Sequence, residues 1–276
     1  WEKPHRGALL IEIGWFSTGR GPASRTLLAA VWEAVQRGDL GLRLRFVFCN
    51  RERGESEETD RFIDQVEGYG IPLRTLSFAR FRAERSGRGM GLNHEAFADW
   101  RVEYDRAVID LLPDRAPALV VLAGYMLVMT PELCGRFTCL NLHPAAPGGP
   151  VGTWQQVIWQ LIDSVATESG IFMHLVTPEL DRGPVVTYCR YPLVSPATAE
   201  GWRQARDAAP GSLQAGLGEA LPLFQQIRAL GVARELPLIL ATLGAFSDGR
   251  IEVVNGRPCG NRGTPIEGID LTREIE

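Results

Sequence analysis

Four polar side chains near the middle of the sequence have the types and the spacing that acyl-transfer chemistry needs. Asn141 and His143 are two residues apart in an apolar stretch that ends at Pro144, so on an extended strand both side chains point to the same side. His174 lies in a second apolar stretch, and Asp181 follows in a turn-like segment. The amide could donate to an oxyanion, the histidine could move protons, and the carboxylate could orient the histidine or stabilise its charge. The alternative is a core histidine that a loop carboxylate satisfies.

The elements that would position these side chains alternate between strands and helices. Short apolar stretches bounded by turn residues are typical of buried parallel strands, and here they alternate with stretches of helical periodicity. This alternation of strands and helices predicts right-handed βαβ crossovers. The expected strands span residues 8–13, 44–49, 73–76, 117–123, 138–141 and 171–176, and the expected helices 26–35, 61–69, 94–112 and 154–165. We therefore predict an α/β fold, with a Rossmann-like, open, mostly parallel sheet and helices on both faces.

Two loops at the carboxyl ends of predicted strands are candidate ligand sites. The first precedes a helix amino end, where free N–H groups and the helix dipole favour an anion. Its candidate phosphate-binding residues are Ser17, Thr18, Gly19, Arg20, Gly21 and Ser24. The second loop is apolar and suits a flat heteroaromatic ring, with the residues Tyr125, Met126, Leu127, Val128 and Met129. The alternative for the first loop is a tight turn without a ligand. The alternative for the second loop is packing against the next helix.

Taken in order along the chain, these segments resemble the formyltransferases that use 10-formyltetrahydrofolate. The family's Asn-x-His-Pro pattern is matched at residues 141–144, and its strand ending in His, followed by Leu-Asp-x-Gly-Pro, is matched by His174 and residues 180–184. Residues 120–126 are similar to the family's strand and folate-side loop. The resemblance covers residues 8–194 and a short match near 234–250. It is strongest to the purine-pathway branch, which formylates glycinamide ribonucleotide.

The resemblance implies a catalytic role for each matched polar residue. Asn141 and a protonated His143 would stabilise the oxyanion that forms when an amine attacks the formyl carbon. Asp181 would hold His143 charged, because a nearby carboxylate favours the imidazolium form, and could relay protons through water. His174 would shape the water network around them. No metal is implied, although two histidines and an aspartate could make a zinc site, because a third strong ligand is lacking.

The resemblance also implies where the two substrates bind. The segment 125–129, together with Asp181, would bind the folate, and the loop at 17–24 would bind the phosphate of the acceptor. Glu235 is a weak candidate for contact with the acceptor sugar; a solvated charge at a helix start is its alternative. The loops at 17–25 and 145–153 and the residue Leu127 depart from the family pattern. Formylation of another amine, on a sugar nucleotide or a secondary metabolite, therefore stays open.

Composition limits the partners and the compartment. The net charge is −4 with both signs spread widely, which argues against a nucleic-acid or membrane-surface binder, and no long apolar run predicts a membrane span. Five cysteines form no CxxC pair and no metal spacing, so a reduced cytoplasm is expected. The expected partners are small molecules: a phosphorylated ribosyl amine and a folate. A homodimer is compatible with the sequence, which does not fix the oligomeric state.

The chain is expected to form one catalytic unit with additions. Residues 1–194 are the expected formyltransferase core, and 195–254 a helical extension that completes the same domain, with an insertion at 195–230. Helices are expected at 221–230 and 235–246, a last strand at 251–254, and a tail at 255–276. The Arg- and Gly-rich residues 77–93 are expected to form a surface loop.

Several rival functions are compatible with parts of this pattern. A hydrolase of the same family would pass the formyl group to water, but is expected to carry an extra amino-terminal domain. Methionyl-tRNA formyltransferase is expected to carry a basic carboxyl-terminal domain. A non-catalytic folate or nucleotide binder has no use for Asn141, His143 and Asp181 together. A dinucleotide oxidoreductase would require a third glycine after Gly19 and Gly21 and an acidic residue at the end of the second strand, and the sequence has neither.

Overall fold

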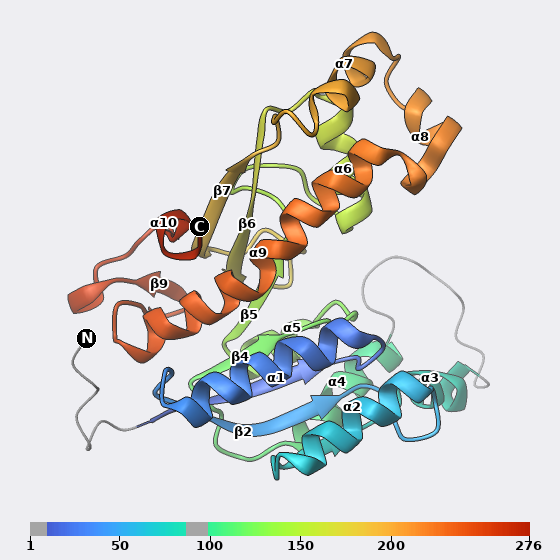
Figure 1. Ribbon diagram of the computed structural model, residues 1–276. Coiled ribbons are helices and arrows are strands. Elements are labelled where there is room, and N and C mark those ends of the chain that lie inside the picture. Colours follow the sequence, from blue (N-terminus) through green and yellow to red (C-terminus); the bar gives the residue numbers. More distant parts are fainter. Residues whose placement is uncertain (1–9, 87–98) are drawn as a thin grey trace.

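The computed structural model describes residues 10–86 and 99–276 (Figure 1). The helical elements in these ranges are α1 (Pro22–Arg37), α2 (Glu57–Gly68), α3 (Phe78–Ser86), α4 (Asp99–Leu111), α5 (Pro131–Arg136), α6 (Trp154–Asp163), α7 (Ala199–Asp207), α8 (Ser212–Leu217), α9 (Pro222–Ser247) and α10 (Thr272–Ile275), with the short 3-10 turns η1 (Gly218–Ala220) and η2 (Asn261–Gly263). The strands are β1 (Ile11–Ser17), β2 (Leu42–Cys49), β3 (Leu73–Thr75), β4 (Leu119–Leu122), β5 (Cys139–His143), β6 (Glu168–Leu175), β7 (Val185–Pro192), β8 (Glu252–Val254), β9 (Arg257–Cys259) and β10 (Ile269–Asp270).

Eight strands form one sheet, in the order β10-β7-β6-β5-β4-β1-β2-β3. β3, β2, β1, β4 and β5 run parallel to one another, and β6 is antiparallel to both of its neighbours. β10 pairs in parallel with the outer edge of β7. The predicted fold class, an open and mostly parallel α/β sheet, is confirmed.

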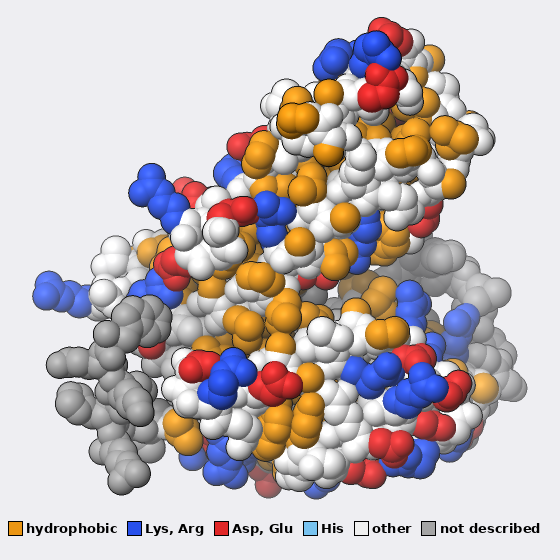
Figure 2. All heavy atoms as spheres, in the orientation of Figure 1, with side chains coloured by type: hydrophobic (Ala, Val, Ile, Leu, Met, Phe, Trp, Pro, Cys, Tyr) orange, Lys and Arg blue, Asp and Glu red, His pale blue; other side chains and the backbone are white. Residues whose placement is uncertain are grey.

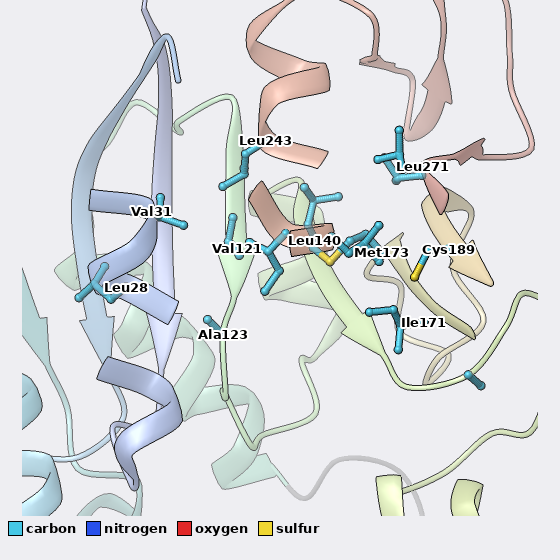
Figure 3. Packing of buried hydrophobic residues seen from close by; sticks show 14 of the residues in the cluster. Leu28, Val31, Val121, Ala123, Leu140, Ile171, Met173, Cys189, Leu243 and Leu271 are labelled. Atoms are coloured by element: carbon cyan, nitrogen blue, oxygen red, sulfur yellow. The ribbon is translucent and has the colours of Figure 1, made fainter. Parts of the chain in front are cut away.

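Helices cover both faces of the sheet, and the side chains of the central strands, which point alternately to the two faces, are therefore buried on both. One core lies between the sheet and α1, α2, α6 and α9 (Figure 3). The side chains labelled there come from α1, the strands, α9 and the segment before α10: Leu28, Val31, Val121, Ala123, Leu140, Ile171, Met173, Cys189, Leu243 and Leu271. The second core lies under α3, α4 and α5 and is rich in aromatic rings, including Phe16, Phe48 and Tyr104. On the face shown in Figure 2, positive and negative side chains are intermixed.

α9 is a single helix of 26 residues, so the expected break between 230 and 235 is wrong. Pro237 lies inside it and cannot donate the hydrogen bond that the carbonyl of Ala233 would accept. Ala233 is exposed, so water can reach that carbonyl. By length and composition α9 could cross a membrane, but ten of its residues are buried, and it packs against β6, β7 and α6.

Two other expected segments differ from the structure, the loop 77–93 and the tail from residue 255. Residues 78–86, expected in a loop, form α3, and residues 87–93 of that loop lie outside the described ranges, as does His94 at the start of the expected helix 94–112. The segment 195–220, expected within the helical extension, folds as α7, α8 and η1, and its role as an insertion stays a prediction. The expected tail from residue 255 carries β9, which pairs with β8, and β10, which extends the main sheet.

Candidate active site

Two neighbouring strands place the amide and both histidines together. β5 carries Asn141 and His143 at its carboxyl end, and antiparallel β6 places His174 directly opposite Asn141. Both histidines are 2% exposed. Asn141 Nδ2 lies 3.4 Å from His174 Nε2. The register of this strand pair therefore joins two side chains that the sequence places far apart.

Asp181 reaches the histidines because the chain after β6 turns back sharply. Asp181 has a left-handed backbone, with φ of +53°. Gly183 permits a very close approach, since a Cβ there would lie 1.6 Å from the carbonyl oxygen of Leu175. The N–H of Leu175 in turn donates to the carbonyl of Pro184 at 2.9 Å. The Leu-Asp-x-Gly-Pro spacing is thus the backbone turn that returns a carboxylate to the strand ends.

Both ring nitrogens of His143 face hydrogen-bond acceptors. Nε2 lies 2.9 Å from the carbonyl oxygen of Pro150, and because a carbonyl only accepts, Nε2 carries a proton. Nδ1 lies 3.4 Å from Asp181 Oδ2. A ring protonated on both nitrogens satisfies both acceptors, and the carboxylate balances its charge. His143 thus lies between a backbone carbonyl and a carboxylate.

His174 has the opposite proton arrangement. Its Nδ1 donates to the carbonyl of Leu175 at 3.0 Å, so Nε2 can accept from the amide of Asn141. Burial lowers the pKa of His174 below its ordinary value, and this effect exceeds the opposing influence of the Leu175 carbonyl and of Asp181. The ring is therefore neutral at pH 7. A neutral His174 fixes the orientation of the Asn141 amide and leaves its second N–H available.

Asp181 is held in its charged form. Burial by itself raises the pKa of Asp181, but the hydrogen bond from His143 and the nearby His143 and His174 rings lower it by more, so the net pKa lies below the ordinary value. The side chain is only 10% exposed. The site thus combines a carboxylate, the His143 ring and a neutral His174 ring in a partly dry environment, where their interactions are strong.

Two cavities meet at Asn141 and Asp181. The first has a volume of about 250 Å³ and is mainly apolar, and the second has a volume of about 290 Å³ and includes His143, Arg228 and Glu235. The residues that line both are Leu122, Tyr125, Met126, Asn141, Gly152 and Asp181. A larger cavity of about 520 Å³, between α5 and the chain after β6, contains none of the predicted site residues. The wall shared by the two smaller cavities carries Asn141 and Asp181, His174 lines the first of these cavities and His143 lines the second.

The segment 125–129 lies along the first cavity, as its apolar composition predicts. All five residues line it. Tyr125 and Met129 are buried beneath it, whereas Met126 and Val128 are exposed. Among the described residues, no hydrogen bond reaches the peptide N–H of Leu127 or Val128. Both peptide donors are available to a ligand, and the folate-binding role of this segment stays a prediction.

The hydroxyl groups of the glycine loop before α1 are partly engaged within the protein. Ser17 Oγ accepts from the N–H of Gly19 at 3.1 Å, and Thr18 Oγ1 accepts from the N–H of Met126 at 3.0 Å. Ser24 lies in the first turn of α1 and is buried. Ser17 and Thr18 are 0% and 4% exposed, so a phosphate could reach their hydroxyl groups only if this loop moved, and their contact with phosphate stays a prediction.

The two cations of this loop differ in their surroundings. Arg25 pairs with Glu58 of α2, whereas Arg20 is exposed and has no ion pair among the described residues. α1 begins after Gly21 and has no acidic residue in its first turn, which leaves its positive end uncompensated. Residues 17–24 line neither cavity, but Leu27 lines the second. Phosphate binding by this loop stays a prediction, with Arg20 as its available cation.

Glu235 lies in the second cavity and is not a helix-start charge, because α9 continues through it. Its Oε1 accepts from Arg228 at 2.8 Å, and the Arg228 guanidinium lies 4.6 Å from the ring centroid of Trp154. Sequence reasoning missed Arg228 and Trp154 as cavity residues. The signal for Arg228 was its spacing, since residues seven apart on a helix share one face.

A metal centre is not visible in the described ranges, where no group of three or more His, Cys, Asp or Glu side chains could hold an ion. His143, His174 and Asp181 instead make the hydrogen bonds and ion pairs described above. The expectation of metal-free chemistry stays a prediction.

Comparison with known proteins agrees with this geometry. The chain is 31% identical over 169 residues to the phosphoribosylglycinamide formyltransferase of Escherichia coli strain K12, covering 60% of this chain and 68% of that protein. It is 29% identical over 131 residues to the formyltetrahydrofolate deformylase of Haemophilus influenzae, covering 46% of this chain and 39% of that protein. The phosphoribosylglycinamide formyltransferase of Coxiella burnetii shares the fold, with a TM-score of 0.58 and 21% identity over 95% of this chain and 99% of that chain. The family described as formyl transferase matches residues 23–209, a range that includes Asn141, His143 and Asp181, and the chain belongs to that family.

Proposed function

We propose that this protein transfers the formyl group of 10-formyltetrahydrofolate to the amine of glycinamide ribonucleotide. The observation that carries the proposal is the shared wall of the two cavities. A group-transfer enzyme must hold its donor and its acceptor side by side at one set of catalytic side chains, and two cavities that share a wall allow this. The Escherichia coli relative, a phosphoribosylglycinamide formyltransferase, supports this choice of acceptor.

The reaction replaces one N–H bond of the acceptor by an N–C bond. The amine nitrogen attacks the formyl carbon, and the carbonyl electron pair moves onto oxygen. The attacking nitrogen loses a proton, the bond from carbon to N10 of the folate breaks, and N10 gains a proton. The products are the formylated amine and tetrahydrofolate. Asn141 donates to the oxyanion, and Asp181, which lines both cavities, takes and returns protons through water.

His143 acts through its positive charge in the geometry described. Its Nε2–H already donates to the carbonyl of Pro150, and its Nδ1 faces Asp181. A charged ring beside Asn141 still favours the oxyanion over the neutral carbonyl, because the buried site screens charge poorly. Direct donation from Nε2 to the oxyanion requires the Pro150 carbonyl to move away. The loop 144–153 therefore controls how fully His143 contributes.

The first cavity is the proposed donor site. Its wall from Tyr125 to Met129 offers apolar side chains and the unpaired peptide N–H groups of Leu127 and Val128, a combination that suits a flat ring with polar edges. Exposed Met126 and Leu180 widen the apolar surface at its mouth. The formyl group would then extend from this cavity towards Asn141.

The second cavity is the proposed acceptor site. Arg228 and Glu235 line this cavity together with Asn141 and His143, and the pair can donate to and accept from the hydroxyls of a sugar. The helix amino end and Arg20 at the loop 17–24 are proposed to hold the acceptor's phosphate. A sugar-linked amine with a phosphate fits this order of groups.

Cytoplasmic location and small-molecule partners belong to the same proposal. All five cysteines are free. Burial raises the pKa of Cys49, Cys134 and Cys189 to about 11, so these thiols are protonated and unreactive at neutral pH. Free, inert thiols suit a reducing compartment. The homodimer stays a prediction.

The test is release of tetrahydrofolate by the purified protein, with and without glycinamide ribonucleotide. We expect release only with the ribonucleotide, and its loss in Asn141→Ala and His143→Ala. Asn261→Ala, at an exposed amide in η2, is the matched control and should keep full activity.

Release of tetrahydrofolate and formate without any acceptor would favour the deformylase activity, for which the Haemophilus influenzae relative is named. Folate binding without turnover would mean that the acceptor is a different amine, and a sugar-nucleotide amine would be tested next. Absence of folate binding would overturn the proposed function.

A further inference from the structure

A buried ion pair on α4 has no evident role in the helix that carries it. Arg101 and Asp105 are one turn apart and are paired, with side chains 8% and 0% exposed. Burying two charges is costly, and their attraction does not reliably repay the lost hydration. An exposed pair at the same spacing would support the helix equally well. The burial of this pair therefore needs another explanation.

The remaining hydrogen-bonding capacity of the pair is directed at the end of the segment that lines the first cavity. Arg101 donates to the carbonyl of Val128 at 2.6 Å. Asp105 Oδ2 accepts from the N–H of Thr130 at 2.9 Å and from its hydroxyl at 2.7 Å. Thr130 is fully buried. Two side chains of α4 thus fix both peptide groups that flank Met129.

The other end of the same segment is fixed by Thr18. Its N–H donates to the carbonyl of Gly124 at 3.0 Å, and its hydroxyl accepts from the N–H of Met126 at 3.0 Å. Residues 124–130 form neither helix nor strand, so the segment has no ladder of its own to set its shape. Its conformation depends on these outside partners.

We infer that the Arg101–Asp105 pair is a positioning device for donor binding, which sets the backbone of residues 126–129 against the folate ring. The inference rests on the proposed function and extends it to residues that line neither cavity. The available N–H groups of Leu127 and Val128 must point at fixed positions to recognise a planar ring. The pair achieves this by holding the peptide carbonyl of Val128 and the N–H of Thr130.

Three variants change the pair or its contact by different degrees. Asp105→Asn removes the charge, Arg101→Lys keeps the charge but loses the forked donor, and Thr130→Val removes one bond to Asp105 while keeping the side-chain shape. Thr130→Ser restores the hydroxyl and is the conservative rescue. Glu12→Gln breaks the partly buried pair with Arg45 near the start of β1, and serves as the control for ion-pair loss elsewhere.

Two readouts separate positioning from general stability. Hydrogen exchange of the ligand-free protein reports the amides of residues 126–130, and calorimetry reports the dissociation constant for 10-formyltetrahydrofolate. In Arg101→Lys and Thr130→Val we expect faster exchange confined to this segment, a dissociation constant raised by about tenfold or more, and a KM for the acceptor within about twofold of wild type. Thr130→Ser and Glu12→Gln should keep wild-type folate affinity.

Two results would overturn the inference. One is a lower melting temperature in Arg101→Lys and Thr130→Val with unchanged folate affinity, which would make the pair a stability element only. The other is unchanged exchange in residues 126–130. The exchange readout needs no ligand, so a failure of this inference is distinct from a failure of the wild-type protein to bind folate. Asp105→Asn is expected to weaken folate binding the most. If the Asp105→Asn protein does not fold, the results for Arg101→Lys and Thr130→Val decide whether the inference holds.

Discussion

Asp181→Asn is the change that most directly tests the site chemistry. Asp181 is held charged next to His143, and it lines both cavities. Asparagine has nearly the same shape, so the turn at residues 180–184 should persist. What is lost is the negative charge that balances the imidazolium of His143 and the ability of the side chain to take a proton.

The magnitude follows from the distance between the two groups. His143 Nδ1 and Asp181 Oδ2 are 3.4 Å apart, and unit charges at this distance attract by about 5 kcal/mol at an effective dielectric constant of about 20. The amide oxygen can still accept from Nδ1, which retains about 1 kcal/mol. The neutral amide is also easier to bury. We expect a net loss of about 3 kcal/mol of transition-state stabilisation, which corresponds to a kcat lower by about two orders of magnitude.

The assay is single-turnover formation of tetrahydrofolate at saturating concentrations of both substrates, which isolates the chemical step. Asp248→Asn, at an exposed carboxylate after α9, is the matched control. A kcat within threefold of wild type in Asp181→Asn would refute the electrostatic reasoning.

Three further predictions concern His174, the turn after β6 and the second cavity. The pKa of His174 is lower in the folded protein than its ordinary value of 6.5. As the pH drops below 6.5, His174 therefore takes up a proton more readily in the unfolded chain, and the free energy of unfolding falls. Urea titrations of His174→Gln should show a shallower acid dependence, by at most about 1.4 kcal/mol per pH unit. Gly183→Ala, whose Cβ would meet the Leu175 carbonyl, should lower the melting temperature strongly or prevent folding, whereas Gly216→Ala, which has open space around it, should not. Steady-state kinetics of Glu235→Gln should give an acceptor KM about tenfold higher, with the folate KM unchanged; equal changes in both would contradict the acceptor assignment.

The strands and the central trio could be predicted because their signals are local. The apolar stretch at 117–123 is long enough to be a central strand, and β4 was found within it. The two-residue period of a strand placed Asn141 and His143 on one side, and both line the second cavity. Asp181 lies beside them because Gly183 and Pro184 constrain the turn, and both were visible in the sequence.

The parts that were missed depend on tertiary contacts. The break expected between residues 230 and 235 does not occur, because packing on β6 and β7 stabilises both halves of α9. Arg101 and Asp105 look in sequence like a solvated pair on a helix surface. Only the path of residues 128–130 reveals that they are buried and bonded to a loop. Arg228 was missed because its significance comes from the cavity that it faces.

The pairing of β10 with β7 has a consequence for synthesis of the chain. Thr187 of β7 pairs with Ile269, so the outer edge of this sheet has no partner until about eighty more residues have been made. At translation rates of about 5–20 residues per second, that edge stays open for about 4–16 seconds. During this interval β7 is an unprotected template for pairing with other chains. Aggregation of nascent chains should therefore depend on how quickly residues 269–270 follow β7 out of the ribosome.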